Sequence, residues 1–525
     1  VLRRVLPGLT PWVQRLIAVL AAVTFALTPT FWSQAVIAEV YSLQTFLVVS
    51  LFLLLLVWAE RRDTRLLLLA AATFGLGLAH HRTTILLAPA VLAFILLEDC
   101  SILRDGRLVL KALILLLLPL ALYLTIPLRA PFTAYLRLPL AQGRVLSLYD
   151  NTLAGFLGFV TGGPFGGYLD FSLDLGARLT MTGGLLSQEL GWVVLALALV
   201  GLVRLVASRC GSLLALTGLT YLVTVAFNLV YNIGDIHVLY IPSYLAVVVW
   251  LAVGVGALSR LGGRLVGQRR LVGVLIVLPF FLLPLWMAIH HYSDLDQSQR
   301  TAVRNEWEAI LAESLPADAV LVSNDRNDIM PMWYFQYVDR LNPGWLGLFP
   351  QITAEYPTLG AVLDLALSTG RPVYLIKEMP GIEVKVAVEG AGRLWHILGP
   401  AAPGQPTYSL DARLADALIL TGYDLSPRSP GPGEDLEVSL YWEAFGPIDQ
   451  VYHSFVHLVD GTGQTVAQSD QQPGGVYYPT SLWRPGERLR DTHLLGVPPD
   501  APEGVYRLLA GMYSLRQDGT LEPLG

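Results

Sequence analysis

Long runs of apolar residues occupy most of the first 292 positions of the chain. A helix that crosses the hydrocarbon core of a bilayer needs about 20 consecutive and mostly apolar residues. Runs that approach or reach this length cover residues 12–31, 40–59, 65–80, 83–98, 109–128, 190–208, 212–230, 240–258 and 271–290. This pattern predicts a polytopic α-helical membrane domain of about nine helices over residues 1–292.

The pattern changes after residue 293, where apolar and polar positions mix as they do in soluble proteins. Val303, Trp307 and Ile310 recur at helical spacing. Further along, DAVLVSND and RPVYLIKE read as buried strands, and TLGAVLDLALSTG reads as a helix between them. This order predicts a small α/β domain with a short parallel sheet over residues 293–410. Its first strand ends in SNDRND, which we interpret as either a ligand-binding turn or a solvated turn.

Residues 411–525 instead alternate with a period of two. In DLEVSLYW, one face of the predicted strand carries Leu436, Val438, Leu440 and Trp442. VYHSFVHLVD and GVYRLLAGMY alternate in the same way, and stretches rich in proline and glycine separate them. The pattern predicts a C-terminal antiparallel β-sandwich. Tyr477, Tyr478 and Trp483 are interpreted as packing residues or, alternatively, as a surface that stacks on sugar.

Composition supports a membrane protein and argues against a nucleic-acid partner. Of the 525 residues, 54% are hydrophobic and 14% are charged, whereas ordinary soluble domains carry about 25% charged residues. A formal net charge of −6 does not suit a protein that binds a phosphate backbone. The two cysteines, Cys100 and Cys210, lie in separate polar connections without a metal or redox spacing, so no disulfide framework is expected.

Basic residues are distributed unevenly between the two sides of the predicted membrane domain. One set of connections holds most of them, at positions 3, 4, 61, 62, 65, 104, 107, 111, 204, 209, 260, 264, 269 and 270. The opposite short connections hold Arg82 alone. Because loops rich in arginine and lysine face the cytoplasm, we expect a multi-pass protein of the cell membrane. Residues 32–39, 79–83, 129–189, 229–239 and both C-terminal domains would then lie outside.

Most side chains with reactive chemistry fall in these outward connections. The candidate site residues are Glu39, Tyr41, His80, His81, Arg82, Arg129, Tyr231, Asp235 and Tyr240. A carboxylate beside an apolar run is costly and commonly marks a site. An arginine presents a planar fork that suits phosphate oxygens. We therefore expect carboxylate, imidazole and guanidinium groups to meet at one depth.

Several of these residues also have a purely structural interpretation. Tyr41 could belong to an interfacial aromatic belt. Arg129 could reach the headgroups from a helix end. Glu39 could cap a helix or form an ion pair with Arg82.

The adjacent pair His80 and His81 raises the question of a metal site. Neighbouring side chains on a helix point in different directions, which favours a phosphate contact over a shared metal ion. No metal ligands are assigned on this basis. The sequence leaves a requirement for a divalent cation open and indicates no other cofactor.

Four motifs carry a resemblance to a known family. FWSQAVIAEVYSLQ, GLGLAHHRTTILLAP, YLTIPLRAP and YNIGDIHVLYIPSYL occur in this order over residues 1–292. They resemble the protein O-mannosyltransferase-like family of the GT-C superfamily of membrane glycosyltransferases. The resemblance is to bacterial relatives of an animal enzyme that mannosylates receptors. The resemblance implies a GT-C-like membrane domain. It also implies transfer of a mannose-like hexose from a polyprenyl-phosphate donor to a protein or glycan acceptor.

The resemblance also implies roles for individual residues. Glu39 and Asp235 would be the catalytic carboxylates, which orient sugar hydroxyls or accept the proton of the acceptor. Arg82, with His80 or His81, would neutralise the departing phosphate. The remaining substrate contacts would be Tyr41, Arg129, Tyr231 and Tyr240.

Members of the superfamily usually carry their main acidic motif on a first outer loop. The segment VLRRVLPGLTPWVQRL resembles the region that follows such a loop, so the chain is expected to be either truncated at its N-terminus or a degenerate relative of the family. Two other functions stay open. A transporter of lipid-linked sugars would place its polar groups near mid-membrane, and a non-catalytic scaffold would bind glycan or protein through its outer domains.

Overall fold

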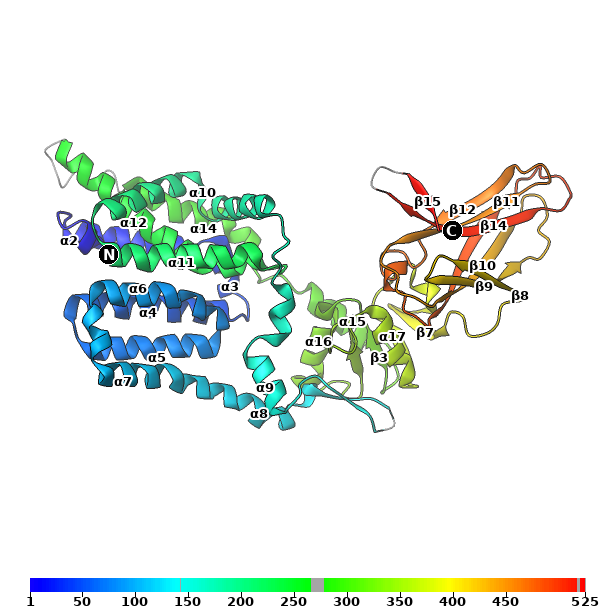
Figure 1. Cartoon of the computed structure of the whole chain (residues 1–525), viewed down its shortest axis with the longest axis horizontal. Coiled ribbons are helices and arrows are strands. Elements are labelled where there is room, and N and C mark those ends of the chain that lie inside the picture. The colour runs from blue at the N-terminus through cyan, green and yellow to red at the C-terminus, as the bar shows by residue number, and fades with distance from the viewer. Residues whose placement is uncertain (142, 266–277, 517–519, 525) are drawn as a thin grey trace. The chain divides into compact units, whose positions relative to one another are not determined.

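The structure is a computed structural model that describes residues 1–141, 143–265, 278–516 and 520–524 (Figure 1). Its internal contacts divide the chain into two units. The membrane unit comprises residues 1–130 and 151–299, and the C-terminal unit comprises residues 131–150 and 300–525. The grouping of residues 131–150 with the C-terminal unit was not predicted. The domain boundary at residue 410 stays a prediction.

The membrane unit is built entirely from helical segments in its described part. In chain order they are α1 (Leu2–Val5), α2 (Pro11–Ala26), α3 (Pro29–Ala35), α4 (Tyr41–Arg61), α5 (Thr64–His80), η1 (Arg82–Leu87), α6 (Ala88–Glu98), η2 (Cys100–Arg104), α7 (Gly106–Leu117), η3 (Leu118–Leu124), α8 (Thr125–Arg129), α9 (Leu153–Val160), η6 (Gly163–Tyr168), α10 (Leu175–Ala207), α11 (Gly211–Val230), η7 (Ile236–Tyr240), α12 (Ile241–Leu265), η8 (Leu278–Phe281) and α14 (Leu282–Leu295). The short η4 (Ala130–Phe132) joins this unit to the C-terminal one.

Within the residues that the structure describes, five helices are long and apolar enough to cross a membrane. They are Tyr41–Arg61, Gly106–Phe132, Leu175–Ala207, Gly211–Val230 and Ile236–Gly262. The pair α2 and α3, which bends by 70°, would make a sixth span if it counts as one. The predicted polytopic helical fold is therefore confirmed.

The number of spans nevertheless differs from the nine predicted apolar runs. The run 12–31 is interrupted because Thr28 is extended immediately before Pro29, and a residue before proline avoids the helical region. The helix Thr64–His80 is shorter than the spans above, and the run 83–98 is divided between η1 and the 11 residues of α6. The run 271–290 begins outside the described residues.

Helices α10 and α12 pack closely because glycines face the opposite backbone. A Cβ atom on Gly254 would lie 2.0 Å from the carbonyl oxygen of Leu197, and one on Gly201 would lie 1.8 Å from that of Trp250. Small residues permit such contacts in membranes, where dispersion forces hold helices together. The same core includes the buried residues Ile17, Tyr240 and Leu251.

The C-terminal unit begins its α/β part with a mixed sheet. The strands β3 (Val320–Val322), β4 (Leu346–Leu348), β5 (Val373–Leu375), β6 (Val386–Ala391) and β7 (Leu394–Pro400) lie in the order β4-β3-β5-β7-β6. Strand β3 is parallel to β4 and β5, whereas β7 is antiparallel to β5 and β6. The helices are α15 (Ala302–Leu311), α16 (Arg326–Tyr337) and α17 (Leu359–Ser368).

The predicted parallel pair is thus present, but α16 and β4 were not foreseen. The segment SNDRND is the start of α16, where the Asp325 carboxylate accepts from the Asn327 amide at 2.8 Å. The hairpin of β1 (Arg137–Pro139) and β2 (Val145–Ser147) packs on this part through buried Leu138 and Leu146.

The antiparallel sandwich is confirmed. One sheet has the order β13-β10-β9-β8 and the other β12-β11-β14-β15. Their bounds are β8 (Tyr408–Leu414), β9 (Leu418–Ser426), β10 (Asp435–Ala444), β11 (Tyr452–Val459), β12 (Thr465–Gln471), β13 (Arg488–Gly496), β14 (Arg507–Leu515) and β15 (Leu521–Pro523). The predicted inner face of β10 is buried, with Trp442 only 1% exposed. Tyr478 and Trp483 are also buried, so they pack inside the protein and do not form an exposed sugar-stacking surface.

Candidate functional site

The first outward connection joins α3 to α4 and carries Glu39. The 70° bend between α2 and α3 turns the chain sideways before this connection. Glu39 is exposed in the turn that follows, and Tyr41 begins α4. The carbonyl oxygen of Val40 accepts a hydrogen bond of 2.9 Å from His80 Nε2. This bond ties the first outward connection to the second.

The second connection holds the two histidines, and they diverge as expected. His80 ends α5, whereas His81 is extended (φ −144°, ψ 120°). The His81 ring lies 5.5 Å from the Tyr41 ring, and its Nδ1 is 2.6 Å from Thr83 Oγ1. Burial, with the charges of His80 and Arg82, lowers the pKa of His81 to about 4. His81 is therefore a neutral imidazole at pH 7, and it can donate from Nε2 when Nδ1 accepts from Thr83.

Arg82 begins η1 and is oriented by the third connection. Its Nη1 donates to the carbonyl oxygen of Phe159 at 3.2 Å, and its guanidinium carbon lies 5.7 Å from the centre of the Phe159 ring. Gly162 approaches so closely that a Cβ there would lie 3.2 Å from Arg82 Nη1. Helix α9 thus restricts the direction of the guanidinium group.

The late connection brings Tyr231 and Asp235 to the same place. Arg178 Nη2 donates to the Tyr231 carbonyl at 2.6 Å, which fixes the backbone just after α11. Asp235 is exposed directly before η7, and its carboxylate makes no capping bond there. The charges of Asp235 and Glu39 both act on the Tyr41 hydroxyl.

Tyr231 links the acidic residues to the basic connection, since its hydroxyl interacts electrostatically with both Asp235 and Arg82. Contacts and electrostatic interactions therefore link seven of the predicted residues. These are Glu39, Tyr41, His80, His81, Arg82, Tyr231 and Asp235.

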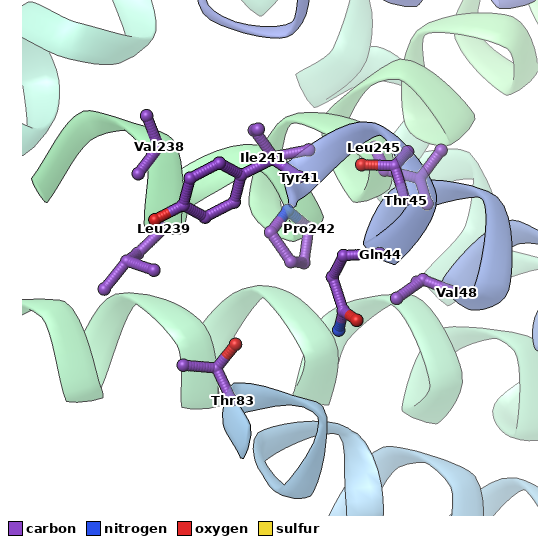
Figure 2. A pocket seen from close by; sticks show the side chains of 10 residues that line it. All are labelled: Tyr41, Gln44, Thr45, Val48, Thr83, Val238, Leu239, Ile241, Pro242 and Leu245. Carbon is purple, nitrogen blue, oxygen red and sulfur yellow. The ribbon is translucent and has the colours of Figure 1, made fainter. Parts of the chain in front are cut away.

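A small cavity lies beside Tyr41. Figure 2 shows side chains from α4, η1, η7 and the start of α12 around it, with Thr83 opposite Gln44. Its volume of about 30 Å³ has room for a water molecule or two and is far too small for a sugar. The exposed carboxylates of the seven-residue group are those of Glu39 and Asp235.

Two predicted residues lie outside the contacts described above. Tyr240 is 0% exposed, its hydroxyl is 2.8 Å from Thr182 Oγ1, and its ring stacks on Tyr244. Its position does not support a substrate contact, because the helical core encloses it. Arg129 is exposed at the end of α8.

A buried carboxylate in α10 was missed by the sequence analysis. Glu189 is 6% exposed and accepts from the backbone amide of Thr30 at 3.1 Å and from its hydroxyl. It therefore holds the first turn of α3, the helix that leads to Glu39. A lone carboxylate at the edge of a long apolar run was the available signal, but the predicted span began at residue 190, one position later.

Buried Gln44 was also missed, and it links α4 to η1 by donating to Thr84 Oγ1 at 2.6 Å. In the part of the chain that the structure describes, no group of three His, Cys, Asp or Glu side chains could hold a metal ion.

Comparison with known proteins finds a similarity for the first part of the chain. Residues 8–102 match the family described as "Protein O-mannosyl-transferase TMEM260 N-terminal domain". No curated protein and no solved structure matches the chain. The matched segment includes five of the seven linked residues, from Glu39 to Arg82. Residues 8–102 are therefore similar to the N-terminal domain of the TMEM260 protein O-mannosyl-transferases.

Proposed function

We propose that the protein transfers a mannose-like hexose from a polyprenyl-phosphate donor to a protein or glycan acceptor at the outer face of the cell membrane. One observation carries this proposal. Acidic and basic connections within the mannosyl-transferase family segment meet the late connection around Tyr41. A transferase of this kind needs both signs of charge close together, because phosphate departs from the sugar while the acceptor hydroxyl loses a proton.

The basic side of the group suits the departing phosphate. The bond from Arg82 to Phe159 restricts the guanidinium, so less side-chain freedom is lost when it binds an anion. Neutral His81 can supply a second donor from Nε2. His80 has a different task, because its Nε2 proton is already given to the Val40 carbonyl.

The acidic side suits the acceptor. Glu39 and Asp235 are both exposed, so a hydroxyl group from a large acceptor can reach them. One carboxylate would take the proton of that hydroxyl. At the same time the hydroxyl oxygen would bond to the anomeric carbon of the sugar, and the bond from that carbon to the phosphate oxygen would break.

Changing Arg82 to alanine tests the proposed phosphate contact. A hydrogen bond to a charged group contributes about 1.5–3 kcal/mol, so transfer should fall roughly ten- to a hundredfold. Lysine at this position keeps the charge without the fork and should restore only part of the loss. The measurement is transfer of labelled mannose from a polyprenyl-phosphate donor to protein by the purified protein in liposomes. Arg65→Ala, in the other set of connections, is the control, and unchanged transfer by Arg82→Ala would contradict the proposal.

The proposed orientation has a separate test. Val505 is 90% exposed in the C-terminal unit, whereas Cys100 is an exposed, unpaired cysteine in a connection assigned to the cytoplasm. An impermeant thiol reagent added to intact cells should label Val505→Cys at once and Cys100 only after the membrane is opened. The reverse order of labelling would refute an outer site.

A further inference from the structure

Helix α16 carries an exposed apolar stripe in the C-terminal unit. Met330, Tyr334 and Tyr337 are 42%, 50% and 36% exposed, and their spacing places them on one face of a helix. The stripe continues beyond the helix in Val338 and Leu341, which are 60% and 45% exposed. The opposite face is buried in the domain core through Ile329, Met332 and Phe335. The exposed stripe is therefore not part of the domain core.

Tyr135, which contacts α16, follows closely after the end of a candidate membrane span. The candidate span Gly106–Phe132 ends three residues before Tyr135, and three residues extend over at most about 11 Å. The Tyr135 ring lies 6.1 Å from the ring of Trp333 and 6.1 Å from that of Tyr337. The C-terminal half of α16 therefore packs against the chain just where that chain leaves the span.

We propose that the α16 stripe, Met330, Tyr334, Tyr337, Val338 and Leu341, lies in the headgroup region of the bilayer. Tyrosine prefers this region because its ring is apolar and its hydroxyl is polar. An apolar helix face on the surface of a domain can lie in this region with the helix axis parallel to the membrane plane. The partner is the lipid surface next to the span, since Tyr135, which contacts Trp333 and Tyr337, follows the end of that span by three residues. This inference does not depend on the proposed transferase activity.

A nitroxide label can measure the contact directly. The full chain, with Cys100→Ser and Cys210→Ser, receives a label at Tyr334→Cys and is placed in phosphatidylcholine nanodiscs without other proteins. Collisions with oxygen, which dissolves in lipid, are compared with collisions with a water-soluble nickel chelate. The control is Leu398→Cys, since Leu398 is 58% exposed on β7, in the same α/β part of the C-terminal unit. The ratio of oxygen to nickel collisions should be several-fold higher at Tyr334→Cys.

Two further outcomes decide the matter. Adding Met330→Asp and Val338→Asp should bring the ratio at Tyr334→Cys down to the control value without unfolding, because both positions are exposed. Equal ratios at Tyr334→Cys and Leu398→Cys in the parent chain would overturn the proposal. A low rate of nickel collisions at Tyr334→Cys in native membranes, but not in nanodiscs of lipid alone, would also overturn the proposal. It would assign the stripe to a protein partner.

Discussion

Replacing Glu39 with glutamine is expected to lower the rate of mannose transfer by at least about a hundredfold. Acid–base catalysis by one side chain contributes roughly 10²–10⁴-fold, and glutamine keeps the shape of Glu39 but cannot accept the proton. Because Glu39 is exposed and lies in a turn, the change should not disturb folding. Donor binding should fall much less than turnover, since the carboxylate acts mainly in the transition state. The measurement is the rate of transfer at saturating and at low donor concentration.

Two companion variants give this result its meaning. Glu60→Gln changes an exposed carboxylate at the other end of α4 and should leave the rate unchanged. Asp235→Asn changes the second candidate, whose charge acts on the same Tyr41 hydroxyl. Loss of activity in Asp235→Asn alone would move the proton acceptor to Asp235. Full activity in both Glu39→Gln and Asp235→Asn would contradict the site.

Replacing Lys385 with methionine is expected to weaken the C-terminal unit by about 3 kcal/mol. Its side chain is 8% exposed, and its ammonium lies 2.9 Å from Glu487 Oε1 and 2.9 Å from Asp364 Oδ1. Asp364 belongs to α17, whereas Glu487 directly precedes β13, so Lys385 joins the α/β part to the sandwich. Removing one partner of a buried ion pair costs about 3–5 kcal/mol. Arg484 still pairs with Glu487, which places the expected loss at the lower end.

Hydrogen exchange of the full chain in nanodiscs measures this loss. Amides of α17 and β13 should exchange faster in Lys385→Met, while those of the membrane unit should not change. Lys377→Met is a matched control, because Lys377 pairs with Asp328 at 2.8 Å but is 37% exposed. A pair at the surface contributes no more than about 1 kcal/mol. Equal effects of the two variants would contradict the buried role of Lys385.

The pH dependence provides a second control for this ion pair. Burial by itself would raise the pKa of Glu487, but the charge of Lys385 and the Tyr478 hydroxyl outweigh burial and hold the pKa below its ordinary value of 4.5. Stability from this carboxylate is therefore present above pH 4.5 and is lost as the pH falls through the lowered value. The difference between the parent protein and Lys385→Met should shrink in that acidic range.

Local patterns were enough to predict the classes of structure and most of the candidate site. The apolar runs predicted membrane helices because lipid requires long unbroken stretches. The alternation through Trp442 predicted a buried strand face because side chains in a strand point to opposite sides. The charged motifs predicted Glu39, His81 and Arg82 as one group, since each stands beside a span on the same side. Each of these signals is read from a short continuous stretch of the chain.

Long-range packing decided the rest. Tyr240 stands in an outward motif, but the contact with Thr182 in α10 buries it. Glu189 stands at the edge of a predicted apolar run. Only the fold showed that it accepts a hydrogen bond from the amide of Thr30, 159 positions away, and so holds α3. The break before Pro29 shortened a predicted span because the preceding residue had to stay extended. The sequence by itself therefore determined the class of structure in each region of the chain and which side chains carry charge. Only the tertiary structure decided which of them meet, because burial and hydrogen bonding depend on residues far away in the chain.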